Sequence, residues 1–255
     1  MTSSIGEGKN QGPAAPGVLL VLNDVASEFE EEFNRWYQQQ HVPERLAVPG
    51  FRSARRYRAV DSGPAYMAVY ECDSIEVFTS KAYQERLANP TDWTRKVMPG
   101  FRNMLRAACR QTWSTGAGVG GAAIIVQCKP APGRDESARR FVEARLAEEL
   151  MPSAALVRMS LWEADPDYTG GASPEMALRG GPDRSADWAL FFESHDLRKS
   201  AAAINLQGLA AAALAAGLLL SSCAKYHLMH ARCSEQGGEC FGAPRPGSQA
   251  LPRRN

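Results

Sequence analysis

The chain has 255 residues, which is enough for one large domain or two small ones. It is 44% hydrophobic and 22% charged, as expected of a globular protein that buries a core. Its 29 basic and 28 acidic residues nearly cancel, so the charge balance carries no electrostatic footprint for nucleic acid. The polar stretch 1–16 lacks the apolar segment of a secretory signal, and we expect it to be disordered.

The cysteine pattern excludes the common zinc and thioredoxin-like motifs. No two cysteines form a C-x-x-C pair, and most lie in apolar segments, where a free thiol behaves as a small hydrophobe. We therefore predict reduced cysteines, a cytoplasmic protein and no bound metal. The six cysteines are Cys72, Cys109, Cys128, Cys223, Cys233 and Cys240.

The first half begins with an apolar run at 17–23, which predicts a buried strand. An amphipathic helix follows, with Phe29, Phe33, Trp36 and Tyr37 on one face, and Pro43 is expected to end it. The next predicted elements are strands at 51–60 and 65–71 around a turn at 61–64, helices at 75–87 and 91–98, and a strand at 105–114. This order, β-α-β-β-α-β, is the ferredoxin-like pattern, and it assigns residues 17–115 to one domain.

A glycine-rich run at 116–121 matches G-x-G-x-x-G. A dinucleotide-binding loop would end a strand and open a helix, whereas this run leads into another predicted strand at 122–128. We interpret it as a flexible linker and as the domain boundary.

The second half, 122–232, repeats the same order and suggests a duplication. Tyr66 to Glu71 aligns with Trp188 to Glu193, and Pro43 aligns with Pro152. After the strand at 122–128, the predicted elements are a helix at 135–150, a strand at 154–164, a long Gly/Pro-rich loop at 165–187, a strand at 188–193, a helix at 196–217 and a strand at 222–232. Residues 233–255 are predicted to be a disordered tail.

The segment 200–224 contains no charged residue and is rich in alanine. Alanine contributes little to membrane insertion, and the segment includes Asn205 and Gln207. A buried helix followed by a strand is the preferred interpretation, and a transmembrane helix is the alternative.

The stretch from Trp36 to Tyr57, WYQQQHVPERLAVPGFRSARRY, resembles the EthD-like branch of the dimeric α/β-barrel superfamily. The resemblance covers 17–115 and is only topological in the second half, where Leu150 stands in place of His41. It implies an α+β fold in which two antiparallel ferredoxin-like sheets pack face to face as a barrel. In this chain the barrel could close within a monomer or between the two chains of a homodimer.

His41 is the main candidate for chemistry, because a histidine near a helix end and among aromatic side chains titrates close to working pH. A structural histidine is the alternative. Tyr57 and Tyr66 are the candidate catalytic partners of His41. The candidate substrate-binding residues are Trp36, Tyr37, Arg56, Tyr70 and Trp93.

The preferred hypothesis is an enzyme without a cofactor that binds a small hydrophobic, aromatic or polyketide-like molecule in the barrel of the first half. His41 would move a proton during cyclisation, decarboxylation or dehydration, as a lyase or isomerase requires. The first alternative is a non-catalytic ligand-binding or interaction module. The second is haem or oxygen chemistry with His41 as the axial ligand.

Overall fold

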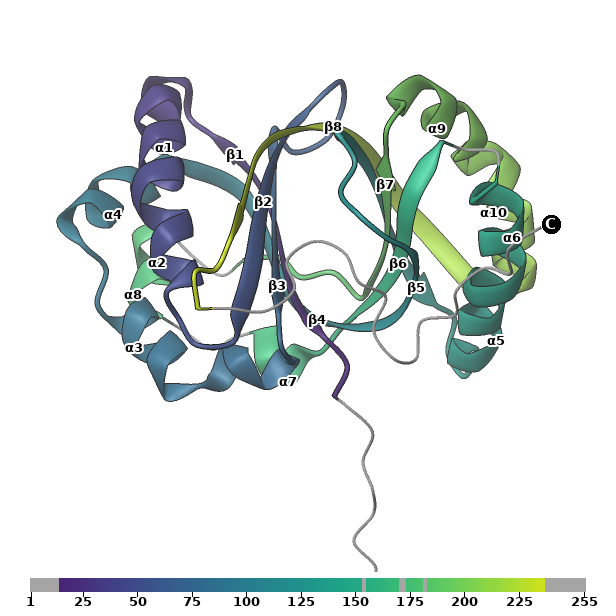
Figure 1. Ribbon diagram of the computed structural model, residues 1–255, viewed down its shortest axis with the longest axis horizontal. Coiled ribbons are helices and arrows are strands. Elements are labelled where there is room, and N and C mark those ends of the chain that lie inside the picture. The colour runs from purple at the N-terminus through teal and green to yellow at the C-terminus, as the bar shows by residue number, and fades with distance from the viewer. Residues whose placement is uncertain (1–13, 153–154, 170–172, 181–182, 237–255) are drawn as a thin grey trace, which may run out of the picture.

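Eight strands form one closed antiparallel barrel in the computed structural model, with helices on its two outer sides (Figure 1). The structure describes residues 14–152, 155–169, 173–180 and 183–236. The strands are β1 (Gly17–Val25), β2 (Phe51–Ala59), β3 (Tyr66–Cys72), β4 (Phe101–Gly116), β5 (Ala122–Pro130), β6 (Leu156–Ala164), β7 (Trp188–Ser194) and β8 (Leu218–Cys233).

The first half contributes the strand order β4-β1-β3-β2, and the second half contributes β6-β7-β5-β8 in the same closed sheet. Each half therefore places its first and third strands in the centre and its second and fourth strands at the edges. The edges meet in the pairs β2–β8 and β4–β6, which close the barrel within one chain. Closure removes every free sheet edge, so the barrel offers no template for edge-to-edge association.

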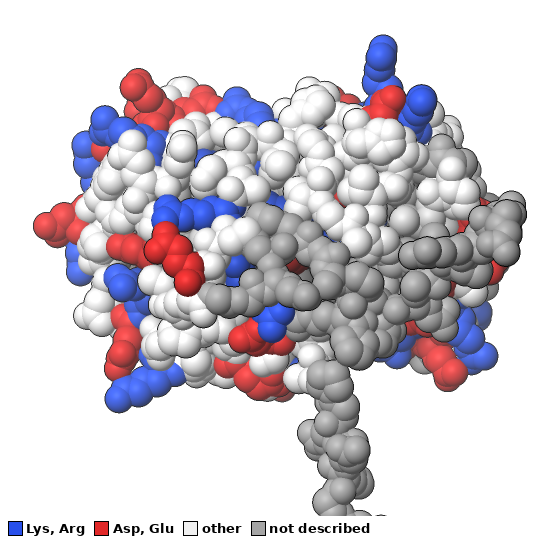
Figure 2. Space-filling model, in the orientation of Figure 1, with Lys and Arg blue, Asp and Glu red and all other residues white. Residues whose placement is uncertain are grey.

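Helices of the first half cover one outer side of the barrel, and those of the second half cover the other (Figure 1). The first set is η1 (Ser27–Phe29), α1 (Glu30–Trp36), η2 (Tyr37–His41), α2 (Val42–Leu46), η3 (Ile75–Thr79), α3 (Lys81–Ala88), α4 (Asp92–Val97) and η4 (Met98–Gly100). The second set is α5 (Asp135–Arg140), η5 (Phe141–Leu146), α6 (Ala147–Leu150), α9 (Leu197–Ala203) and α10 (Leu206–Ala215). Acidic and basic side chains alternate around the rim of the face drawn in Figure 2.

The central strands of the sheet carry apolar residues on both faces, because both faces are buried. Residues such as Val18 and Leu20 of β1 point into the barrel, whereas Leu19 and Val21 pack against the helices outside it. This arrangement explains why the run at 17–23 shows no alternation of apolar and polar residues. The interior is thus a packed core and not an open channel.

Among the described residues, a group of four charged side chains lies within this interior. Arg55 of β2 and Arg158 of β6 each bind both Glu71 of β3 and Glu193 of β7. The four nitrogen–oxygen distances lie between 2.5 and 2.8 Å, and Arg55 and Glu193 are fully buried. We call these residues the interior ring. Each half supplies one arginine and one glutamate, so the ring ties the two halves together across the barrel.

The helix of the first half continues through Pro43 to Leu46, and the prediction that Pro43 ends it is wrong. A π-turn at η2 precedes the proline, and the amide of Val42 donates to the carbonyl of Tyr37, five residues earlier. The wider turn changes the carbonyl positions that a proline ring would otherwise meet, and Pro43 begins the next helical turn, where its missing N–H is harmless.

The glycine-rich run at 116–121, which was predicted to be a linker, contacts the second half at two of its glycines. A Cβ atom at Gly120 would overlap the backbone of Ser194, and one at Gly116 would overlap the carbonyl of Val157. The run is therefore packed against the second half at these two positions, and strand β5 follows it, in keeping with the rejection of a dinucleotide loop.

Replacing Gly120 by alanine is expected to lower the free energy of unfolding by about 1–3 kcal/mol, because the added methyl meets backbone and not a movable side chain. Gly121→Ala is the matched control, since no atom lies within 4 Å of a Cβ there. It should be neutral or stabilising by up to about 1 kcal/mol. Urea denaturation of both variants measures the difference, and equal stabilities would contradict a packed run.

Three further expectations need correction. The predicted loop at 165–187 contains two short helices, α7 (Pro166–Thr169) and α8 (Pro174–Leu178), and α8 lies beside the helices of the first half (Figure 1). The predicted helix at 196–217 is divided into α9 and α10 around Asn205, whose side chain caps α10. Cys233 is disulfide-bonded, so the expectation of reduced cysteines fails at this residue.

No helix among the described residues is long and apolar enough to cross a membrane. The segment 200–224 consists of the end of α9, the ten-residue α10 and the start of β8. Of the predicted tail at 233–255, residues 233–236 belong to the described structure, and the amide of Ser234 donates to the carbonyl of Arg52. The remaining residues of the tail, and 1–13, lie outside the described ranges.

Candidate functional site

A cavity of about 360 Å³ lies on the outer face of the first-half sheet, between the sheet and its helices. Leu19, Val21 and Tyr70 form part of its floor, and residues of η2, α2 and α3 form its walls. Helices α7 and α8 of the second half complete the enclosure. This cavity lies outside the barrel, whereas the predicted ligand position was within it. The described barrel interior holds apolar side chains and the interior ring.

His41 enters the cavity wall from the π-turn η2. Its ring centroid lies 4.4 Å from that of Trp36 and 4.9 Å from that of Tyr37, so aromatic neighbours fix its orientation. Burial lowers the pKa of His41 well below its usual value, and the guanidinium groups of Arg45 and Arg56 lower it further. The imidazole is therefore neutral at neutral pH and can accept a proton.

Tyr37 lines the wall beside His41, and Tyr70 lines the floor below them. Burial raises the pKa of both hydroxyls, and the neighbouring Tyr37 raises that of Tyr70 further. The Tyr70 hydroxyl is buried and has no hydrogen bond of good geometry to the described residues. Both tyrosines remain protonated at neutral pH, so they can donate hydrogen bonds to a ligand.

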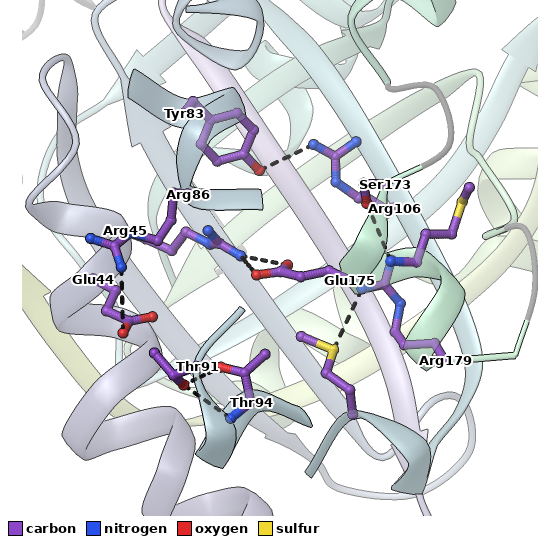
Figure 3. Close-up of polar contacts among 12 residues, drawn as sticks. Glu44, Arg45, Tyr83, Arg86, Thr91, Thr94, Arg106, Ser173, Glu175 and Arg179 are labelled. Carbon is purple, nitrogen blue, oxygen red and sulfur yellow. Dashed lines mark hydrogen bonds and ion pairs between the residues drawn. The ribbon is translucent and has the colours of Figure 1, made fainter. Parts of the chain in front are cut away.

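A buried ion pair joins the two halves at the cavity. Nη2 of Arg45 on α2 lies 2.7 and 2.6 Å from the two carboxylate oxygens of Glu175 on α8 (Figure 3). The Arg45 guanidinium also lies over the ring of Tyr83, at 5.5 Å from its centroid. The hydroxyl of Tyr83 accepts a hydrogen bond of 3.2 Å from Arg106 of β4.

Of the eight residues selected from the sequence, the structure brings three to the cavity: His41, Tyr37 and Tyr70. Trp36 supports the imidazole from behind and donates its indole N–H to Thr94. The other four predicted residues, Tyr57, Tyr66, Arg56 and Trp93, do not line it.

Strand geometry explains the positions of Tyr57 and Tyr66. Successive side chains of a strand alternate between its faces, and Tyr57 points into the barrel, where it packs beside Phe191. Tyr66 shares the outer face with Tyr70 but lies four residues away along β3, about 13 Å at the usual rise. Its hydroxyl bonds Glu30 and Asn34. The predicted partnership of His41 with either tyrosine does not fit this geometry.

Arg56 and Trp93 are held by other partners. The Arg56 guanidinium lies 4.0 Å from the ring centroid of Tyr37, behind the cavity wall, and donates to Asn34. Trp93 donates its indole N–H to Glu32 on α1. Both residues therefore act on the packing around the site and do not contact its interior.

Sequence reasoning missed Arg45, Tyr83, Arg106 and Glu175. A signal for Glu175 was present in Ser173-Pro174-Glu175, a capping serine followed by a proline at the first helical position, and the Ser173 hydroxyl does cap α8. Charged residues at four-residue spacing, Glu175, Arg179 and Asp183, were a second signal. Within the described ranges, no three His, Cys, Asp or Glu side chains gather closely enough to hold a metal ion.

Comparisons with known proteins support the fold and leave the chemistry open. Residues 18–106 match a family described as "Domain of unknown function (DUF4286)". No match was found among curated proteins. One similar solved structure is an anthrone oxidase-like protein, with a TM-score of 0.59, 10% identity, and coverage of 87% of this chain and 94% of the other.

Two further structures have the same overall fold. A candidate monooxygenase from Fusobacterium nucleatum subsp. nucleatum ATCC 25586 has a TM-score of 0.54 and 11% identity, over 91% of this chain and 99% of the other. A candidate chlorite dismutase has a TM-score of 0.53 and 8% identity, over 85% and 96%. At these identities the likeness shows the fold alone, a mixed α/β protein with a closed antiparallel eight-stranded barrel, similar to the dimeric α/β barrels.

Proposed function

We propose that the first-half cavity binds a small aromatic or polyketide-like molecule and that His41 takes a proton from it without a cofactor. The observation that carries this proposal is the neutral imidazole of His41 in the wall of a cavity of about 360 Å³. That volume falls at the lower end of the range for small-molecule pockets. Cyclisation and dehydration begin with such a proton removal next to a carbonyl group. Decarboxylation needs the reverse transfer, of a proton to the carbon that carbon dioxide has left.

The roles of the neighbouring side chains follow from their positions. Trp36 and Tyr37 hold the imidazole in place. The hydroxyl of Tyr70, buried and without a good partner among the described residues, donates a hydrogen bond to the carbonyl oxygen of the ligand. Such a donor stabilises the negative charge that develops on this oxygen when the neighbouring carbon loses its proton.

The structural neighbour described as anthrone oxidase-like supports this ligand class. Anthrone is a three-ring aromatic ketone, and its central carbon loses a proton readily. A reaction with oxygen would begin with the same proton removal, so the oxygen-using alternative shares the first step with the preferred one.

Exchange of hydrogen for deuterium at C1 of 2-tetralone, followed by proton NMR in D₂O, tests the proposal without knowledge of the natural substrate. We expect the protein to accelerate this exchange and His41→Gln to reduce the acceleration by about 10²- to 10⁴-fold. Because the pKa of His41 is lowered, the rate should stay constant as the pH falls below about 6.5 and decline only in more acidic solution.

His195→Gln is the matched control, since His195 is exposed on the second half and does not line the cavity. Binding of 2-tetralone without accelerated exchange would favour the alternative of a non-catalytic ligand-binding module. A loss of exchange in both histidine variants would assign the effect to something other than His41.

Haem fits these residues poorly. Haem is a wide, flat macrocycle, whereas the cavity is small and the His41 ring is wedged between Trp36 and Tyr37. An absorbance spectrum of the purified protein tests this alternative, because bound haem gives an intense band in the near-ultraviolet.

We also infer that the chain arose by tandem duplication of a ferredoxin-like unit, with units at 17–115 and 122–232. The matching strand orders support this, as do the π-turns η2 and η5, which occupy equivalent helices of the two halves. We also propose a relationship to the EthD-like proteins, and the position of the W-Y-x-x-x-H-V-P element at the cavity wall supports it. In the second half, Leu150 packs into an apolar cluster, so that half serves to complete the barrel.

A further inference from the structure

Three arginines line the cavity, and two of them, Arg45 and Arg106, contact Tyr83 (Figure 3). Arg45 lies against the face of the Tyr83 ring, and Arg106 donates to its hydroxyl. The two cations therefore approach the same part of the cavity from different elements, α2 and β4.

The donors of Arg45 are only partly used. Its Nη2 holds both oxygens of Glu175, but its Nη1 is buried and has no hydrogen-bond partner among the described residues. The whole residue is 3% exposed, so ordinary solvent contact does not satisfy this nitrogen. A buried donor without a partner costs free energy in the empty protein, and a ligand acceptor would remove that cost.

Arg106 is the second cation, and its visible partners are neutral. Its guanidinium donates to the backbone carbonyl of Thr169 and to the hydroxyl of Tyr83. Within the described part of the chain, no carboxylate forms an ion pair with it, whereas Arg110 on the same face of the strand pairs with Glu76 and Asp165. Arg179 also lines the cavity but pairs with Asp183, and Asp167 is a further acid in the lining. Among the described residues, Arg106 is thus the lining arginine that has no carboxylate within ion-pair distance.

We infer that the ligand of this cavity is an aromatic carboxylate, whose carboxylate group lies between Arg45 and Arg106 while its ring lies against Tyr37 and Tyr70. The inference rests on the proposed function and names the substrate class more narrowly. Guanidinium groups form strong charge-assisted hydrogen bonds with carboxylates, and a planar acid suits a wall of aromatic side chains. A carboxylate would accept from Nη1 of Arg45 and balance the charge of Arg106 in one group.

The test compares 2-naphthoate with 2-naphthamide, which have the same shape and differ in charge. Binding is followed by naphthalene fluorescence at neutral pH. We expect the wild-type protein to bind naphthoate about 10- to 100-fold more tightly than naphthamide. In Arg106→Gln this preference should fall to less than about 3-fold, while naphthamide binding is kept, which also shows that the variant is folded.

Arg110→Gln is the control, because Arg110 lies on the same strand and face, has acidic partners and does not line the cavity. It should keep the full preference for naphthoate. Equal binding of the two probes by the wild type would overturn the carboxylate inference alone, and the proposed function would stand. If neither probe binds, both the carboxylate inference and the proposed function are overturned. If Arg106→Gln and Arg110→Gln lose the preference for naphthoate to the same extent, the preference arises from general surface charge, and the carboxylate inference is overturned.

Discussion

Replacing Glu193 by glutamine is expected to lower the free energy of unfolding by about 3–5 kcal/mol. Glu193 is fully buried inside the barrel, where it binds Arg55 and Arg158. Glutamine keeps the shape of the side chain but removes its charge, so Glu71 alone would face two buried guanidinium groups. Urea denaturation measures the change, and an unaltered dependence on urea would show that it arises in the folded state.

Glu136→Gln provides the control for this prediction. Glu136 pairs with Arg140 on the helix surface, where the two side chains are 78% and 72% exposed, and its loss should cost less than about 0.5 kcal/mol. A cost of less than 1 kcal/mol for Glu193→Gln would contradict the interior ring as a structural link between the two halves.

The interior ring also sets the acid limit of stability. Burial alone would raise the pKa of Glu71, but Arg55 and Arg158 lower it far below its usual range. A carboxyl group with a lowered pKa stabilises the folded state above its unfolded pKa, about 4.3, and this stabilisation is lost as the pH falls below that value. The wild-type protein should therefore lose stability progressively in acid below about pH 4.3.

Local patterns were sufficient to predict the strands and the principal helices. Short apolar runs predicted β1, β3, β5 and β7, because these strands form the centres of the two half-sheets and are buried on both faces. The extra length of β4 and β8, sixteen residues each, was not predicted. At their N-terminal ends the additional residues pair with β1 and β5 of the same half, and at their C-terminal ends they pair with β6 and β2 across the barrel closure. Such pairing with distant segments leaves no local sequence pattern.

The site was predictable only for residues that lie close together in the sequence. His41 and Tyr37 lie on a single helical stretch, and Tyr70 lies on a nearby strand, so motif and periodicity identified them. Arg45 lies in the same stretch, but its place in the site depends on its ion pair with Glu175, which is 130 residues away in the sequence. The segment that carries Glu175 is rich in glycine and proline and was interpreted as a loop, since its helices are too short to show a period.

The ion pair between Arg45 and Glu175 leads to the second large expected effect. Glu175→Ala should lower the free energy of unfolding by about 3–5 kcal/mol, because it leaves Arg45 charged and buried without its acid. Arg45 cannot escape this cost by losing its proton, since arginine stays protonated in proteins. Urea denaturation of the single variant measures the free-energy cost of leaving the buried Arg45 charge unpaired.

The double variant Arg45→Met/Glu175→Ala separates the pair from the packing around it. Methionine fills much of the arginine volume without a charge, so the double variant should recover most of the stability lost by Glu175→Ala. The coupling energy from the full cycle then reports the contact between α2 of the first half and α8 of the second. A coupling energy near zero would mean that α8 does not hold the wall of the cavity in solution. A large one would mean that the second half stabilises the site in which His41 lies, although its own equivalent position carries Leu150.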